Sequence, residues 1–346
     1  MNNYGIPTPI RASYVVEAQG ANSADDLIAL YQSMEPNAAD MLNEFGSILF
    51  RGFDIRNQQC FARIVRAIGG EIADYVDGNS PRTKIASGVY TSTEYPPAYS
   101  ISLHNELSYA GRWPSRLFFF CLVAPRDGGA TTLADSRSVL HAIDPAIVDE
   151  FRRKQVKYVR NLHSGIGYGK SWQQTFETDD PTTVEGFLAA SGSQWEWKAD
   201  KALRIWSVHP ATAWHPKTRE EVWFNQADQF HPSTHPKDIY ETLKTLYEGN
   251  EDNLPQNACF GDGTPIPESM LESIRNAVAS QTVGCQWQLG DFLIVDNVLM
   301  SHGRRSFRGE RKILVSMTGE LSWEFCRRPL DEPKALPVGR QMRERL

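Results

Sequence analysis

The 346-residue sequence lacks the features that mark several large classes of protein. It has no excess of positive charge, since 36 Lys and Arg stand against 42 Asp and Glu, and the net charge of −6 argues against a nucleic-acid-binding protein or a polybasic membrane anchor. No apolar run approaches the ~20 residues needed to cross a bilayer. Residues 1–20 lack a basic start followed by an apolar core, so we expect no signal peptide.

Cysteines are few and have no regular spacing. The five of them are odd in number, widely scattered and without a CxxC motif: Cys60, Cys121, Cys259, Cys285 and Cys326. This argues against a disulfide framework or a cysteine-rich zinc site and predicts a reducing, cytoplasmic location. The hydrophobic fraction of 41% and the charged fraction of 23% are those of an ordinary globular protein.

Local patterns predict helices near the N-terminus and strands further along. Ser23 is placed to cap the first helix. The expected helices are 24–34, 38–44, 58–69 and one that begins at 136–141; the expected strands are 46–53, 116–124, 130–134, 286–296 and 312–318. A long region from about 144 to 280 mixes helical segments with tryptophan-rich loops.

Strands before and after this region must pair across it if they form one sheet. The simplest architecture that meets this requirement is an antiparallel double-sheet barrel with helical insertions. We therefore expect a single domain over residues 1–346, with a long insertion at about 144–280. A two-domain chain that divides near Asp144 is the alternative.

The most informative motif is Leu103-His-Asn-Glu106. In an extended segment, residues i and i+2 point to the same face, so His104 and Glu106 are placed to bind one ion together. His302, about 200 residues later, is the candidate third ligand. Two imidazoles and a carboxylate with open positions are the ligand set of non-haem Fe(II) oxygenases. Zinc accepts the same ligands, so a zinc hydrolase is an alternative.

Arg311 opens the apolar strand expected at 312–318, whereas its neighbouring arginines lie in a turn. From there its guanidinium can project into a barrel and bind a carboxylate in bidentate fashion. A second alternative function rests on residues 164–171, a near match to the phosphate-binding P-loop that has Ser164 where the first glycine belongs. A glycine-rich lid over the barrel mouth is our preferred interpretation of this loop.

In combination, these motifs resemble the TauD/TfdA-like Fe(II)/2-oxoglutarate-dependent dioxygenases. The resemblance runs through most of the chain and rests on Gly46 to Phe53, Leu103 to Glu106, Gly128 to Thr131, Asp296-Asn297, His302-Gly-Arg304 and Arg311. It implies a double-stranded β-helix, the jelly-roll fold, and a mainly β class with helical insertions. It also implies Fe(II) as the metal, with 2-oxoglutarate and O₂ as co-substrates.

The resemblance also assigns residues to roles. His104, Glu106 and His302 match the metal ligands, Arg311 matches the arginine that holds the distal carboxylate of 2-oxoglutarate, and Thr131 matches the threonine that assists it. Because the carboxylate ligand is present, hydroxylation or a related desaturation or cyclisation is favoured over halogenation.

Within the family, the chain is most similar to the syringomycin-pathway aspartyl hydroxylase type. This implies oxidation of an aliphatic carbon of an amino acid or an amino-acid-derived intermediate, either free or presented on a carrier protein. Val315 stands where the taurine enzyme has a second arginine, which argues against a sulfonate substrate. Asn225 and Gln226 follow the apolar pair Trp223-Phe224 and are candidates for orienting the substrate; capping of their own loop is the alternative.

Overall fold

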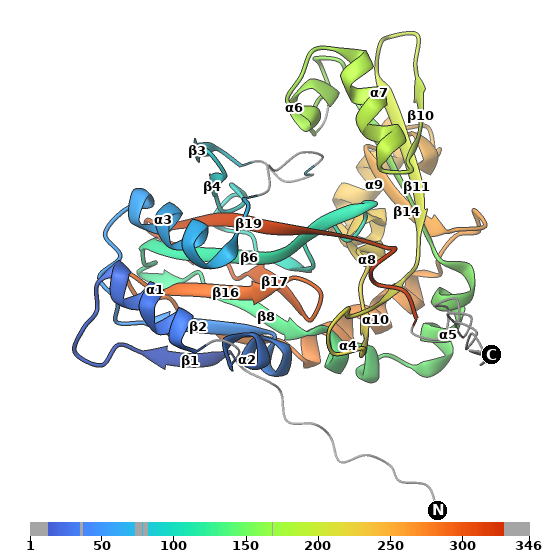
Figure 1. Ribbon diagram of the computed structural model, residues 1–346. Coiled ribbons are helices and arrows are strands. Elements are labelled where there is room, and N and C mark those ends of the chain that lie inside the picture. Colours follow the sequence, from blue (N-terminus) through green and yellow to red (C-terminus); the bar gives the residue numbers. More distant parts are fainter. Residues whose placement is uncertain (1–12, 35–36, 73–77, 79–81, 168, 329–346) are drawn as a thin grey trace, which may run out of the picture.

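The computed structural model describes residues 13–34, 37–72, 78, 82–167 and 169–328 (Figure 1). Two β-sheets form its centre. In sheet order, the larger consists of β1 (Tyr14–Glu17), β2 (Ser47–Arg51), β16 (Phe292–Asp296), β6 (Arg112–Val123), β19 (Lys312–Ser322), β4 (Val89–Thr91) and β3 (Lys84–Ala86). The smaller consists of β15 (Val283–Cys285), β8 (Thr131–Asp135), β17 (Met300–Arg304) and β5 (Ile101–His104). In both sheets, strands from before residue 144 pair with strands from after residue 280, as the sequence pattern predicted.

Strand β6, in the middle of the larger sheet, is buried on both of its faces. Its central residues are all apolar, and alternate side chains point to opposite faces. Leu117 and Phe119 face the core between the two sheets, where Phe119 lies 5.3 Å from the His302 ring of the smaller sheet, centroid to centroid. Phe118 and Phe120 face the other way. A strand covered on both sides reads as a continuous apolar run in the sequence.

A layer of three helices covers the outer face of the larger sheet (Figure 1): α1 (Ala24–Ser33), α2 (Asn37–Phe45) and α3 (Gln58–Gly69). Leu27 of α1 and Phe61 of α3 pack there, and the Phe61 ring stacks on Phe120 of β6 at 5.5 Å between centroids. Ser23 caps α1 and exchanges hydrogen bonds with Asp26, which satisfies backbone N–H groups that the helix itself leaves without acceptors.

Residues 144–167 and 169–280 lie alongside one end of the two sheets (green to orange in Figure 1). Their strands are β9 (Val156–Leu162), β10 (Gln194–Trp197), β11 (Leu203–His209), β12 (Thr212–Trp214), β13 (Glu221–Trp223) and β14 (Gln256–Phe260). Their helices are α5 (Pro145–Lys154), α6 (Trp172–Phe176), α7 (Pro181–Ala190), α8 (Ala227–Phe230), α9 (Lys237–Leu246) and α10 (Glu268–Ser280), with 3₁₀ turns at Pro232–Thr234 and Glu251–Asn253. Four of these strands form a sheet of their own, in the order β10-β11-β9-β14.

The remaining elements are α4 (Ser136–Ala142), β7 (Asp127–Gly128) and β18 (Phe307–Arg308). The assignment of residues 1–346 to one domain with an insertion at 144–280 stays a prediction. Within the described residues, no helix combines the length and the apolar character that a membrane span requires.

One expected strand begins later than predicted, and one observed strand was not expected. The strand expected at 286–296 begins only at Phe292, because the backbone turns at 288–291, where the Asp291 side chain accepts the Gln288 N–H. Strand β17, which carries His302, was not expected, since Met-Ser-His-Gly-Arg has neither β-branched nor alternating apolar residues.

Candidate metal centre

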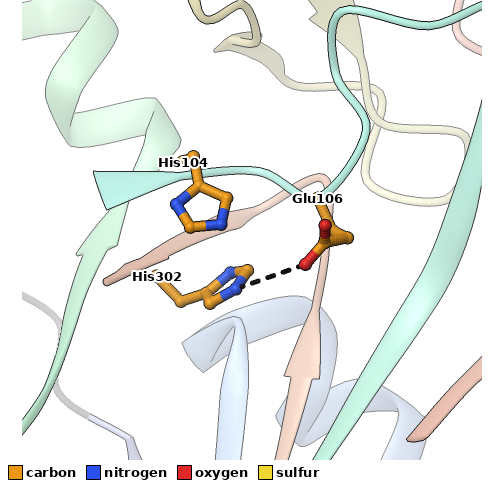
Figure 2. Close-up of side chains that lie close together, drawn as sticks. All are labelled: His104, Glu106 and His302. Carbon is orange, nitrogen blue, oxygen red and sulfur yellow. Dashed lines mark ion pairs between the residues drawn. The ribbon is translucent and has the colours of Figure 1, made fainter. Parts of the chain in front are cut away.

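Strand register brings the two candidate histidines together. β17 runs antiparallel to β5, with His302 directly opposite His104, so their rings lie side by side with centroids 4.4 Å apart (Figure 2). The glycine after His302 allows this close approach, because a Cβ on Gly303 would lie 2.6 Å from the Ile101 carbonyl oxygen of β5.

Glu106 reaches the same point by a different route from the one expected. The extended segment ends at His104, and Glu106 lies in a turn in which Leu107 has a positive φ of 58°. The fully buried Asn297 holds this turn: its Oδ1 accepts the Glu106 N–H at 2.7 Å and its Nδ2 donates to the Glu106 carbonyl at 2.9 Å. The i, i+2 argument was therefore wrong in its backbone geometry, although the two side chains do converge.

The three side chains present ligand atoms within 4.8 Å of one another. Glu106 Oε2 lies 3.8 Å from His302 Nε2 (Figure 2). His104 Nδ1 lies 2.9 Å from the Ser102 carbonyl, which only accepts, so this nitrogen carries the hydrogen and Nε2 is left for a metal. Burial, followed by the nearby His104 and Arg82, holds the pKa of His302 well below its usual value, so its ring is neutral. Two imidazoles and a carboxylate fit ferrous iron.

A residue that sequence reasoning missed touches this centre. Arg82 Nη2 lies 2.5 Å from Glu106 Oε2, and their side chains are 3% and 5% exposed. Arg82 is 24 residues from Glu106 and belongs to no motif, so the sequence carries no signal for this contact.

Arg311 and Thr131 lie together beside the histidines. Arg311 donates from Nε to the Gly129 carbonyl at 2.9 Å and from Nη2 to Thr131 Oγ1 at 3.3 Å. Burial, followed by the neighbouring Arg304, lowers the pKa of Arg311 to about 10, which still leaves it charged near neutral pH. Trp287 donates to the same Thr131 oxygen at 3.0 Å and fixes that side chain.

These residues line a cavity of about 30 Å³, which we call the narrow cavity. Its lining is Arg82, Ser92, Thr93, Ile101, His104, Phe119, Thr131, His302, Gly303, Arg304, Arg311 and Ile313. Three arginines line it, of which Arg82 is paired with Glu106, so the narrow cavity suits an anionic group beside the metal ligands.

A larger hollow of about 400 Å³, the broad cavity, reaches the centre from another direction. It is lined by Thr93, Tyr95, Tyr99, Ser100, Ile101, Ser102, His104, Glu106, Tyr109, Gln226, Gln229, Phe230, Thr234, His235, Pro236 and Gln256. Gln226 is therefore at its wall, with Nε2 donating to the Asn105 carbonyl at 2.8 Å. Asn225 is not among the lining residues; its amide caps its own loop, bonding the Ala211 carbonyl and the Ala227 N–H.

The 164–171 loop does not have the surroundings of a phosphate-binding loop. It follows β9, but the helix after it, α6, has only five residues, and Ser171 serves as its N-cap. Lys170 donates to the Gly78 carbonyl at 3.0 Å. Tyr168 lies outside the described residues.

The comparisons with known proteins agree with this geometry. Residues 13–318 match the family model described as "Taurine catabolism dioxygenase TauD, TfdA family". The chain belongs to the TauD/TfdA family. This family member is 36% identical over 316 residues to the dapdiamide synthesis protein DdaC of Enterobacter agglomerans, covering 91% of this chain and 94% of that one. It is also 31% identical over 288 residues to a clavaminate synthase-like protein of Arabidopsis thaliana, covering 80% and 82%.

Solved structures share the fold of this TauD/TfdA family member. PvcB of Pseudomonas aeruginosa superposes with a TM-score of 0.51 at 16% identity, over 92% of this chain and 94% of that one. AAD-2, solved with Mn(II) and N-oxalylglycine, gives 0.51 at 12% identity, over 89% and 94%. The jelly-roll prediction is thereby confirmed.

Family membership also confirms the predicted class of enzyme and its cofactors. The protein is a non-haem Fe(II)/2-oxoglutarate-dependent dioxygenase that uses O₂. Family membership argues against the zinc hydrolase, and the short helix after residues 164–171 argues against the nucleotide-binding protein.

Proposed function

We propose that this dioxygenase oxidises, by hydroxylation in the simplest case, an aliphatic carbon of an amino acid or an amino-acid-derived intermediate of natural-product synthesis. 2-Oxoglutarate and O₂ are consumed, and succinate and CO₂ are released with the hydroxylated product. The observation that carries the proposal is the convergence of His104, Glu106 and His302 within 4.8 Å beside a cavity lined by guanidinium groups. The similarity to DdaC, a dapdiamide synthesis protein, supports the substrate class.

In this proposal His104, Glu106 and His302 hold the iron, which supplies the oxidising power when bound with 2-oxoglutarate and O₂. The Ser102 carbonyl fixes the His104 tautomer, and Asn297 fixes the backbone of Glu106. A carboxylate ligand occupies the position that a halide would need, so hydroxylation is favoured over halogenation.

Arg311 and Thr131 hold the distal carboxylate of 2-oxoglutarate in the narrow cavity. The guanidinium is charged and half-buried, so water screens its attraction for a carboxylate less than at the surface. The Gly129 carbonyl and Trp287 keep the two side chains in position before the co-substrate arrives.

The broad cavity takes the substrate. Among the described residues, Glu106 is the only Asp, Glu, Lys or Arg that lines it, and burial lowers the pKa of His235, so that ring is neutral. A free α-carboxylate would find no cationic partner in such a lining. An amide or thioester carries no charge, so its burial costs much less free energy than burial of an unpaired carboxylate. We therefore propose a substrate whose carboxyl group is masked, as in an aminoacyl group presented on a carrier protein, with Gln226 at the cavity wall as an orienting residue.

Succinate formation tests the reaction class. Purified protein with Fe(II), 2-oxoglutarate and ascorbate is expected to form succinate in step with a substrate product that is 16 mass units heavier. Hydrolysis with zinc and no succinate would overturn the assignment.

The form of the substrate is tested by offering each amino acid in three forms: free, as its amide, and as a carrier-protein thioester. We expect the masked forms to be oxidised far faster than the free acid. Equal or faster turnover of the free acid would contradict the masked-carboxyl proposal and leave the reaction class intact.

A further inference from the structure

The ion pair between Arg82 and Glu106 joins an arginine to a carboxylate that is a proposed iron ligand. The contacted oxygen, Glu106 Oε2, is the one that lies 3.8 Å from His302 Nε2. Both side chains are almost completely shielded from water. A charged pair in such surroundings is costly to break from one side, because the remaining charge is left buried without compensation.

The two cavities show from which side Arg82 reaches the carboxylate. Arg82 lines the narrow cavity and not the broad one, whereas Glu106 lines the broad cavity and not the narrow one. The guanidinium therefore stands between the carboxylate and the space assigned to 2-oxoglutarate. A Glu106 side chain that turned toward that space would have to displace a buried cation.

We infer that Arg82 is a positioning residue for the carboxylate ligand: its hydrogen bond to Glu106 Oε2 keeps this oxygen oriented for iron beside His302. Each oxygen of an ionised carboxylate has two lone pairs, so Glu106 Oε2 can accept the hydrogen bond from Arg82 and also bind a metal beside His302. The coordination positions that face the narrow cavity then stay available to the co-substrate. This inference rests on the proposed ligand set and concerns Arg82 alone.

A competing role for Arg82 is physically possible, and it predicts the opposite change in iron affinity. If Arg82 merely occupied the carboxylate until iron displaced it, removing Arg82 would strengthen iron binding. If Arg82 orients the ligand, removing it weakens iron binding, and partners of metal ligands typically contribute about 10- to 100-fold in affinity.

The test is an anaerobic Fe(II) titration of the full chain, read by competition with a chromophoric chelator. For Arg82→Gln we expect an iron dissociation constant raised roughly 10- to 100-fold, and for Arg82→Lys, which keeps the charge but loses the guanidinium, a smaller rise. Arg51→Gln is the matched control, since it removes another guanidinium that pairs with a buried carboxylate, Asp291, and lines neither cavity; its iron affinity should equal that of the wild type.

A second measurement reports the coordination itself. The charge-transfer absorption of the Fe(II)·2-oxoglutarate complex should shift in Arg82→Gln at saturating iron, because losing this hydrogen bond changes the donor strength and orientation of the carboxylate and so the ligand field. Wild-type iron affinity in Arg82→Gln, or tighter binding, overturns the inference. If Arg82→Gln does not fold, Arg82→Lys decides: an intermediate loss supports the inference and unchanged affinity overturns it.

Failure of the inference is distinguishable from failure of the proposed function. A wild-type protein that binds neither Fe(II) nor 2-oxoglutarate would contradict the ligand set as a whole. If the wild type binds both and Arg82→Gln has the same iron affinity, only the positioning role of Arg82 is contradicted.

Discussion

The narrow and the broad cavity meet at His104 but differ in size, charge and origin. The narrow one, about 30 Å³, is lined by three guanidiniums and lies mostly on strands of the two central sheets. The broad one, about 400 Å³, is lined by hydroxyl, amide and aromatic groups. Much of its wall comes from residues 226–256, within the region proposed as an insertion.

This difference separates two tasks. A co-substrate that never changes is best held by side chains on rigid strands, where their positions are fixed by hydrogen-bonded register. A substrate that differs among relatives is best met by loops and added segments, which can vary without disturbing the core. We therefore expect mutations in the two cavities to affect different kinetic constants. Mutations of the metal ligands, which form the junction of the two cavities, should affect turnover as a whole.

The largest effect is expected at the junction. His302→Ala and His104→Ala should each abolish turnover, because a centre with one imidazole and one carboxylate cannot retain iron in the required geometry. Succinate formation measures this directly. His141→Ala, which removes a histidine that lines neither cavity, serves as the control. Ordinary activity in either variant would remove that residue from the ligand set.

The next largest effect is expected in the narrow cavity. Arg311→Ala removes hydrogen bonds to a charged group, worth about 1.5–3 kcal/mol, so the KM for 2-oxoglutarate should rise roughly 10- to 150-fold. Iron affinity and the KM for the substrate should stay unchanged. Equal losses of iron and 2-oxoglutarate binding would mean that Arg311 supports the fold instead.

Thr131→Val should act in the same direction but less strongly. It removes one neutral hydroxyl, worth about 0.5–1.5 kcal/mol, so the KM for 2-oxoglutarate should rise roughly 2- to 12-fold. Thr131→Ser keeps the hydroxyl that Trp287 and Arg311 contact and should restore most of the affinity. A Ser variant as impaired as the Val variant would assign the effect to packing.

The smallest effect is expected at the rim of the broad cavity. Tyr99 lines it while 61% exposed, and its ring lies 6.0 Å from that of Tyr95. Tyr99→Ala should raise the KM for the substrate a few-fold and leave that for 2-oxoglutarate unchanged, while Tyr99→Phe should stay near wild type. A change in the 2-oxoglutarate constant would show that the two cavities are not independent.

Local elements were predicted well where local physics sets them. Helix α3 has the predicted bounds Gln58–Gly69, and the Ser23 cap is present. The apolar runs at β2 and β6 are strands, since a continuous apolar run suits a strand that is buried on both faces.

Contacts between distant segments were predicted less completely. Strand β17 carries no strand signal and owes its conformation to pairing with β5 and β8. Asn297 was noted as part of a motif, but its bonds to Glu106 depend on a turn 191 residues away. The Arg82 contact and the Trp287 contact had no sequence signal at all.

The sequence by itself determined which chemical groups this enzyme has and in which order they occur. Helix caps, apolar periodicity and the His-x-Glu motif involve residues within a few positions of one another, so they can be recognised in the sequence before the fold is known. Only the tertiary structure decided that His302 stands opposite His104, that Asn297 bends the chain at Glu106, and that Arg82 faces the carboxylate. Such contacts depend on strand register and burial, which sum many weak interactions over the whole chain and leave no local trace.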